Sequence, residues 1–182
     1  MVSLTSVDES HAEVTRGPID SVEIRSIFAD NGYSGVRLLS CGEPVTNIHV
    51  SGVYGTYRHN AVLVSQHDLY PEPVWFNNIT IEHVHASKST CPLQTPKFVR
   101  WEKNAQKLAL VWLERGIVAG TITLRDISRE EHGSSEAPMI QIDAGAVIEK
   151  LTVEGISQTL EKGSLAPAYV NEAKVSELHY IE

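Results

Sequence analysis

A chain of 182 residues, 42% of them hydrophobic, is long enough for one domain with a sizeable core, which excludes a wholly disordered protein. Its formal net charge of −8 argues against nucleic acid or an anionic membrane as a partner, because both need clustered Lys and Arg. No apolar run reaches the roughly 18 residues of a membrane span, and the polar N-terminus lacks the apolar core of a signal peptide. We therefore expect a cytoplasmic chain, or a fragment of an exported protein.

The first 17 residues show no regular apolar pattern and predict a flexible leader or cap, followed by a single domain over residues 18–182. Within that domain a phrase recurs five times, with apolar residues at the first, third and sixth of six positions. Its copies are Val22-Ile24-Ile27, Ile48-Val50-Val53, Ile79-Ile81-Val84, Ile122-Leu124-Ile127 and Leu151-Val153-Ile156. Such self-similarity indicates stacked repeats, in which each unit buries its apolar side against the next.

A second apolar strand signal lies between the copies, at residues 36–39, 61–64, 110–113, 139–142 and 168–170. Each unit therefore predicts one free-standing strand followed by a bent pair of strands, with no helical period between them. The repeat spacing is interrupted once, by an insertion over residues 86–107. We predict an all-β protein, a right-handed parallel β-helix of about six coils with three strands per coil. An irregular β-sandwich is the alternative.

Stacking sets equivalent residues of neighbouring coils roughly 4.8 Å apart, so aliphatic positions should form continuous inward ladders. One predicted ladder is Ile48, Ile79, Ile122 and Leu151. The asparagines at 47 and 78 stand where a tight bend needs a left-handed backbone, which Asn tolerates. The outward set Glu82, Arg125 and Glu154 alternates in charge, and this alternation supports the register.

Two segments, Gly-Val-Arg-Leu-Leu-Ser at 35–40 and Val-Thr-Asn-Ile-His-Val at 45–50, carry a family resemblance. They resemble the polygalacturonase family of glycoside hydrolases and the wider pectin-lyase-like β-helix group, in which a Gly-x-Arg-Ile-Lys strand precedes a similar phrase. The resemblance covers residues 20–160 in pattern and 35–53 in motif. It implies that Gly35 and Arg37 lie on a substrate-binding strand.

The chain departs from that family at the residues that matter for chemistry. Leu39 stands where the family has a lysine, which weakens the expectation of acidic-sugar binding. The family's Asn-Thr-Asp, Asp-Asp and Gly-His-Gly motifs, which carry its catalytic carboxylates, do not occur in the sequence. In the family they precede the Arg-Ile-Lys strand, whereas only about one coil precedes Arg37. The chain therefore resembles the C-terminal portion of such a β-helix, without the catalytic coils.

The outward residues of the free-standing strands form two predicted columns. The first is Arg37, Leu63, Trp112, Gln141 and Tyr169, and the second is Leu39, Ser65, Glu114, Asp143 and Asn171. Aromatic rings suit stacking on sugar rings, so we expect the first column, Leu63 excepted, to bind a polysaccharide unless the insertion or a partner chain covers it. Glu114 and Asp143 fall on adjacent coils. Carboxylates about 5 Å apart are typical of retaining glycosidases, so this pair would be catalytic in an active enzyme, or else an ordinary charged edge.

Two further groups of residues invite a functional interpretation. Tyr57 and Arg58 follow the second copy of the phrase and are expected to contact substrate, or else to pack as a corner. His83 and His85 are spaced to share one face of a strand. No carboxylate or cysteine pattern in the sequence completes a zinc site around them, so neither a metal nor a cofactor is predicted.

These observations favour a non-catalytic or catalytically incomplete carbohydrate-associated module with a polysaccharide as its partner. An active glycoside hydrolase or polysaccharide lyase using Glu114 and Asp143 is one alternative. A structural protein that self-assembles is the other, because open end coils expose backbone edges that recruit further strands. On the same ground we expect a homo-oligomer in which another subunit covers the open end coils.

Overall fold

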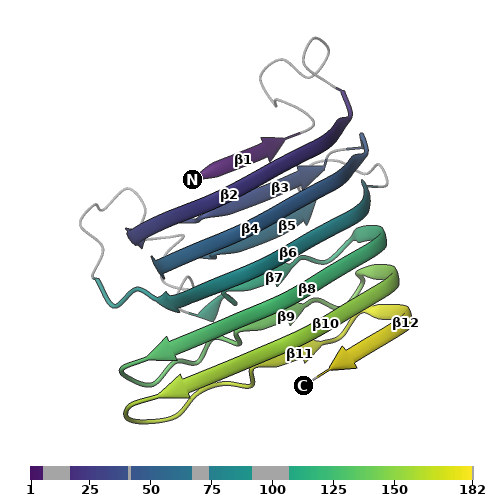
Figure 1. Ribbon diagram of the computed structural model, residues 1–182. Helices are drawn as coiled ribbons and strands as arrows, with labels where there is room; N and C mark the ends of the chain where they lie inside the picture. The colour runs from purple at the N-terminus through teal and green to yellow at the C-terminus, as the bar shows by residue number, and fades with distance from the viewer. Residues whose placement is uncertain (6–16, 41, 67–73, 92–106, 182) are drawn as a thin grey trace.

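The computed structural model describes residues 1–5, 17–40, 42–66, 74–91 and 107–181, which form two parallel sheets (Figure 1). Sheet A contains six short strands, β1 (Val2–Thr5), β3 (Val36–Ser40), β5 (Val62–Gln66), β7 (Val111–Leu113), β9 (Ile140–Ile142) and β11 (Tyr169–Asn171). Sheet B contains β2 (Ile19–Gly32), β4 (Val45–Tyr57), β6 (Val74–Lys88), β8 (Ile117–Glu131), β10 (Val147–Leu160) and β12 (Lys174–Ile181). The chain alternates between the sheets, so one short and one long strand make each turn.

The result is a parallel β-solenoid of about five turns, which confirms the predicted all-β parallel architecture. The predicted three strands per coil become two, because the bent pair runs as one continuous strand of 13 to 15 residues in β4, β6 and β8. The expected six coils are not all complete. The last strand, β12, has 8 residues and lies at the edge of sheet B, so the final coil is partial.

Residues in the left-handed conformation bend each long strand without ending it. The first bend contains Asn47 and Asn78, both with φ of 53°, as predicted. A second bend carries positive φ values in five successive coils, at Ser26, Gly52, His83, Asp126 and Gly155. The corner residue interrupts the in-and-out alternation of the strand. Two positions rather than one therefore separate the last two apolar residues of each copy of the phrase.

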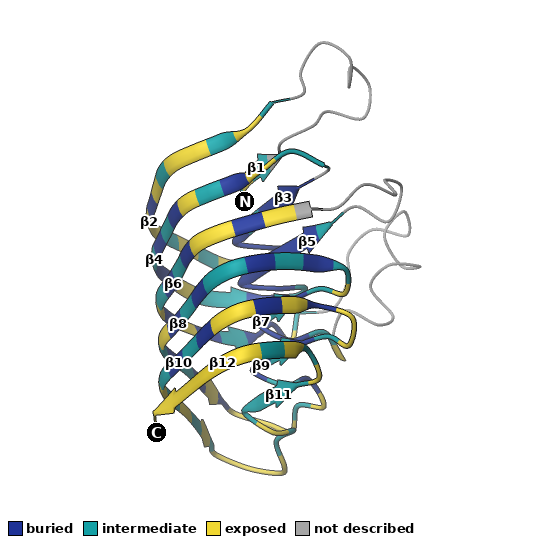
Figure 2. Cartoon of the chain, turned by 90° about the vertical axis from the view of Figure 1, so that its right-hand side faces the viewer, coloured by how far each residue is buried: buried dark blue, intermediate teal, exposed yellow. Residues whose placement is uncertain are grey.

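The core lies between the two sheets and is built from the predicted ladders. Parallel pairing aligns Ile48, Ile79, Ile122 and Leu151, and all four are buried. Burying one such side chain stabilises the fold by about 1.5–3 kcal/mol, so the stacked ladders are the main source of stability. Figure 2 shows the consequence along sheet B, where buried and exposed residues alternate.

The outward side of sheet B carries the predicted charge alternation. Arg125 Nη1 lies 3.5 Å from a Glu82 carboxylate oxygen, and Arg125 Nε lies 3.1 Å from Glu154. Each charge thus faces an opposite charge on the next coil, which confirms the register across three coils. Because Arg125 is half exposed, these pairs add only about 0–1 kcal/mol each.

The N-terminal segment differs from its prediction. Residues 2–5 form β1, which pairs with β3 in parallel, so the solenoid begins earlier than the expected boundary at residue 18. A four-residue strand is too short to show periodicity in the sequence. The rest of the expected leader, residues 6–16, and most of the expected insertion, residues 92–106, lie outside the described residues. Among the described residues, no helix is long and apolar enough to cross a membrane.

Candidate functional site

The outer face of sheet A aligns most of the predicted contact column. Pairing of β3, β5, β7 and β9 brings four residues into register: Arg37, Leu63, Trp112 and Gln141. At the centre of this face Leu63 is only 7% exposed and Ser65 in the neighbouring column is buried, while Arg37, Trp112 and Gln141 are half-buried. The Trp112 Nε1 atom is buried and has no hydrogen-bond partner among the described residues. A polymer would find little open surface here.

The last member of each predicted column lies in a different place. Tyr169 pairs with Ile140 and Asn171 pairs with Ile142, so both predictions were wrong by one residue. With Tyr169 outward, its smaller neighbours would have to fill the core of the last coil. Instead the larger Tyr169 ring packs against the core and lies 5.4 Å from the ring of Tyr180. It does not continue the row that begins at Arg37.

Glu114 and Asp143 directly follow β7 and β9 at the same edge of sheet A. The Glu114 amide donates to the Val64 carbonyl (2.9 Å) and the Asp143 amide donates to the Leu113 carbonyl (3.0 Å). The two residues therefore occupy equivalent places on adjacent coils, as the sequence predicts. The Asp143 carboxylate accepts a hydrogen bond from Gln141 Nε2 (2.6 Å). A catalytic role for the pair stays a prediction.

Tyr57 and Arg58 lie where β4 ends, and the structure places them in a packed corner. Tyr57 is fully buried, its hydroxyl donates to the Tyr54 carbonyl (3.0 Å), and burial raises its pKa to about 12. A ligand cannot reach that ring. Arg58 is half buried, and its carbonyl accepts a hydrogen bond from Lys88 Nζ (3.1 Å). This was the alternative interpretation of the segment, and we do not carry Tyr57 into a binding site.

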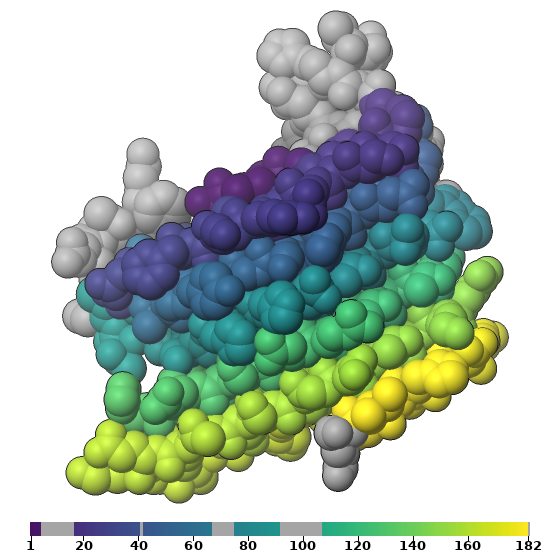
Figure 3. Space-filling view, viewed as in Figure 1, coloured from purple at the N-terminus to yellow at the C-terminus, as the bar shows by residue number. Residues whose placement is uncertain are grey.

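The outer face of sheet B, by contrast, presents exposed aromatic rings in register. Phe28, Tyr54 and His85 align on β2, β4 and β6, and we call them the aromatic row. Phe28 is 74% exposed and Tyr54 39%, and the Tyr54 and His85 rings stack with centroids 5.7 Å apart. Figure 3 shows the side of the molecule on which the long strands lie as parallel ridges, one for each strand. Exposed rings repeated from coil to coil offer an extended apolar surface.

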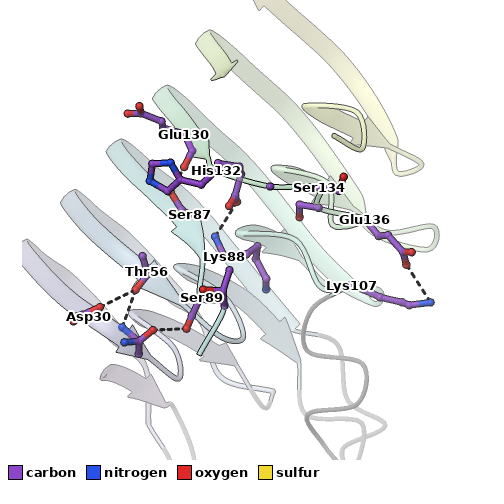
Figure 4. Close-up of a pocket in the computed structure, with 15 residues that line it drawn as sticks. Asp30, Thr56, Ser87, Lys88, Ser89, Lys107, Glu130, His132, Ser134 and Glu136 are labelled. Atoms are coloured by element: carbon purple, nitrogen blue, oxygen red, sulfur yellow. Dashed lines mark hydrogen bonds and ion pairs between the residues drawn. The ribbon is translucent and has the colours of Figure 1, made fainter. Parts of the chain in front are cut away.

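A polar groove lies beside the aromatic row, where β2, β4, β6 and β8 end (Figure 4). Its volume is about 590 Å³. The hydroxyl-bearing residues that line it are Thr56, Ser87, Ser89, Thr90, Ser134 and Ser135. The charged ones are Asp30, Lys88, Lys107, Glu130, Glu131, His132 and Glu136. Because the groove crosses successive coils, it runs along the solenoid axis and suits an extended ligand.

Hydrogen bonds between coils hold the groove in shape. The Asn31 amide donates to Thr56 Oγ1 (2.8 Å), and the Ser89 hydroxyl donates to the Asn31 side-chain oxygen (2.5 Å). On the next coil, the Ser87 hydroxyl donates to the Glu130 carbonyl (2.5 Å). The lining hydroxyl groups are thus fixed before any ligand arrives, which reduces the entropy lost on binding.

A buried charged cluster lies along one wall of the groove. Lys88 Nζ donates to the carbonyls of Arg58, His59 and Leu108, at 3.1, 2.6 and 3.0 Å. Burial lowers the pKa of Lys88 to about 7, against the opposing effect of Glu131, and burial raises the pKa of Glu131. The three carbonyl acceptors favour the ammonium form. Lys88 therefore ties the end of β6 to the neighbouring coils, which is a structural role.

Sequence reasoning missed the aromatic row, although a signal for it is present. Phe28, Tyr54 and His85 each directly follow the last apolar residue of a copy of the phrase. They therefore share one place in the repeat, but the sequence-based prediction pairs His85 with His83 and does not align these three positions. The groove could not be found in this way, because its residues come from strand ends and from the turns after them.

The structure also joins residues that the sequence keeps apart. His83 and His85 come together with Asp126, and one ligand atom from each lies within 4.8 Å of the others. The prediction of no metal considered only ligand patterns along the chain. Asp126 is 43 positions from His83 and reaches it through the parallel pairing of β6 with β8.

No family model, no curated protein and no solved structure matches this chain. No family match therefore supports the resemblance at residues 35–53. What the structure shares with that group is the coarser feature, a parallel β-solenoid.

Proposed function

We propose that the chain is a non-catalytic carbohydrate-binding module, a right-handed solenoid of the pectin-lyase-like kind that holds one polysaccharide chain along its axis. The aromatic row carries this proposal, because exposed rings at coil spacing offer a continuous apolar strip to successive sugar rings. The adjoining groove supplies hydroxyl and carboxylate oxygens for the sugar hydroxyl groups. The binding face is therefore sheet B, and the row predicted on sheet A is given up because its centre is buried.

The charge of the groove favours a neutral polymer. Four carboxylates line it, at Asp30, Glu130, Glu131 and Glu136. Of its cations, Lys88 Nζ binds three carbonyls and Lys107 lies 3.4 Å from Glu136. A polyuronate would meet net negative charge here and on a chain of net charge −8. The replacement of the family's lysine by Leu39 agrees with this preference.

Affinity electrophoresis in gels that contain single polysaccharides tests the proposal. We expect at least one neutral plant or bacterial glycan to retard the chain, whereas polygalacturonate should not. The double variant Phe28→Ala, Tyr54→Ala should bind at least tenfold more weakly, since each lost ring contact is worth about 1 kcal/mol. Trp75→Ala is the matched control, because Trp75 is an exposed ring on β6 outside the row. Equal retardation of the double variant, or none of the wild type, would refute the proposal.

Self-association is the second candidate, and the last coil favours it. Leu178 and Tyr180 on β12 continue the inward ladders of Leu151 and Val153. They are nevertheless 49% and 42% exposed, because no described strand covers their far side. Inward residues left open at a sheet edge form a template for a further strand.

A second copy in head-to-tail orientation would continue the same register. The facing pairs would be Val22 with Leu178, Ile24 with Tyr180 and Glu23 with His179, extrapolated from the ladders that run from β2 to β12. Two of these pairs are apolar, and the third pairs a carboxylate with an imidazole. Such an interface does not close on itself, so chains rather than dimers are expected.

Light scattering after size exclusion tests this second candidate. The mean mass should rise with concentration in the micromolar range, and Leu178→Lys should hold the chain as a monomer. Ser157→Lys is a control that adds the same charge to the neighbouring strand β10, at an exposed position outside the stretch that pairs with β12. A monomer at every concentration would rule out assembly through this edge.

The enzyme alternative makes a separate prediction. Without the family's carboxylate motifs we expect no release of reducing ends or unsaturated products from any glycan that binds. The double variant Glu114→Gln, Asp143→Asn should therefore behave like the wild type. Product release that is lost in this variant would make the chain a hydrolase or lyase.

A further inference from the structure

Two histidines and one aspartate meet on the outer face of sheet B, at its second bend. His83 Nδ1 lies 2.6 Å from Asp126 Oδ2, and His85 Nε2 lies 3.4 Å from the same oxygen. One carboxylate oxygen thus faces two imidazole nitrogens from the adjacent strand. Two imidazoles and one carboxylate are ligands that divalent ions of the zinc class prefer.

The second nitrogen of His85 faces an acceptor at hydrogen-bond distance, whereas that of His83 does not. His85 Nδ1 lies 2.5 Å from Ser128 Oγ, and His83 Nε2 lies 3.9 Å from Glu82 Oε1. A proton on His85 Nδ1, shared with Ser128, leaves the lone pair of His85 Nε2 directed toward Asp126. Metal-binding histidines have this arrangement, since an outer acceptor fixes the tautomer and the ring orientation. The stacked Tyr54 ring further restrains His85.

Two of the three distances are close to those of a tetrahedral site, and the third, between the two imidazole nitrogens, is within 4.8 Å. Ligand bonds of about 2.0–2.1 Å place the ligand atoms of tetrahedral zinc about 3.3 Å apart. The His85 to Asp126 distance already has this value, and the His83 to Asp126 distance must lengthen by less than about 1 Å. All three side chains are 40–47% exposed, so they have room to adjust.

The backbone gives an independent indication. His83 and Asp126 have φ values of 55° and 49°, a conformation that Gly adopts without cost and that the equivalent Gly52 and Gly155 adopt in other coils. Side chains at such positions strain the backbone. Three of the five corners carry side chains, Ser26, His83 and Asp126, and the two on adjacent strands are those that can serve as ligands.

We propose that His83, His85 and Asp126 bind one zinc-class divalent ion, which completes its coordination with water and links β6 to β8. The site stands on these contacts alone and does not rest on glycan binding. The same chain offers simple histidine–carboxylate pairs for comparison, His179 with Glu177 (2.6 Å) and His132 with Glu161 (3.0 Å). Neither pair belongs to a group of three ligand residues among those described.

Calorimetric titration of the full chain with zinc chloride, after removal of metals by a chelator, tests the site. We expect one ion per chain, and at least tenfold weaker binding in His83→Asn, His85→Ala and Asp126→Asn. Asn tolerates the left-handed backbone at positions 83 and 126, as it does at Asn47 and Asn78, so these variants should fold. His179→Asn is the matched control and should bind like the wild type. Ser128→Ala should bind roughly tenfold more weakly, because it removes only the outer acceptor.

Thermal unfolding supplies a second measurement. Zinc should raise the midpoint of the wild type and of His179→Asn, because the ion binds only the folded chain, and should leave Asp126→Asn unchanged. The inference is overturned by the absence of zinc binding. It is also overturned if folded Asp126→Asn and His83→Asn chains, checked by circular dichroism, bind as tightly as the wild type.

Discussion

The outer faces of the two sheets share one arrangement of strands but differ in how exposed their side chains are. Both sheets consist of parallel strands whose inward residues are buried, and both align their outward residues from coil to coil. On sheet A the outward Leu63 is 7% exposed, whereas on sheet B the outward Phe28 is 74% exposed. Orientation toward the outside is therefore not the same as access to a ligand. The difference moves the expected binding face from sheet A to sheet B.

The largest expected effect comes from comparing a buried and an exposed arginine on one strand, β8. Arg129 is fully buried, and its guanidinium donates to the Ala137 carbonyl and to the Gln158 side chain, both at 2.6 Å. Arg129→Met should lower the free energy of unfolding by about 3 kcal/mol, because buried acceptors lose their donors. Arg125→Met, on the exposed face, should cost less than about 1 kcal/mol. Urea unfolding of both variants measures the difference, and equal losses would break the contrast.

The next effect compares the two outer faces directly. Leu63→Ala on sheet A should lower the free energy of unfolding by about 2 kcal/mol, since it removes a buried side chain and leaves a cavity. Phe28→Ala on sheet B should change it by less than about 0.5 kcal/mol. The same urea series decides the point. A large loss in Phe28→Ala would mean that the aromatic row stabilises the fold rather than a complex.

The smallest expected effect is a pH dependence that comes from an interior histidine. Burial, with a contribution from the Lys88 charge, lowers the pKa of His59 to about 4, and its ring stacks on Tyr33 at 5.0 Å. Between pH 4 and 6.5 the unfolded chain therefore binds a proton that the folded chain does not. Stability should fall by about 1 kcal/mol as the pH drops from 6.5 to 5.5, the upper part of this range. The His59→Phe variant should lose less stability than the wild type over that range, and above pH 7 the two should show the same pH dependence. Equal loss of stability in acid would show that His59 is not the group responsible.

The sequence predicts the ladders well because their signals are local and repeated. Ile79 and Ile122 lie in equivalent copies of the phrase, and the structure pairs them. Asn47 reveals the first bend through its residue type. The second bend has an equally clear signal, with Ser, Gly, His, Asp and Gly at one place in five copies, but it needs knowledge that a corner interrupts the alternation.

The candidate site is less accessible to sequence reasoning, for physical reasons. The closed surface around Trp112 depends on how much of the chain packs over it, which no periodicity encodes. Tyr169 fills an inward place because the end of the solenoid lacks a further coil to supply the core. Asp126 joins His83 only through pairing across 43 positions. The local sequence pattern predicts whether a side chain points inward or outward. How exposed that side chain is, and which distant residues it meets, depends on the assembled fold.

Chemical-shift mapping with a bound neutral oligosaccharide tests the central claim most directly. We expect shift changes at Phe28, Tyr54 and Ser87 on the outer side of β2, β4 and β6. We expect none at Trp112 or Gln141 on sheet A. Changes confined to those two residues would return the binding face to sheet A. The absence of changes with every neutral glycan that is tried would contradict carbohydrate binding by this solenoid.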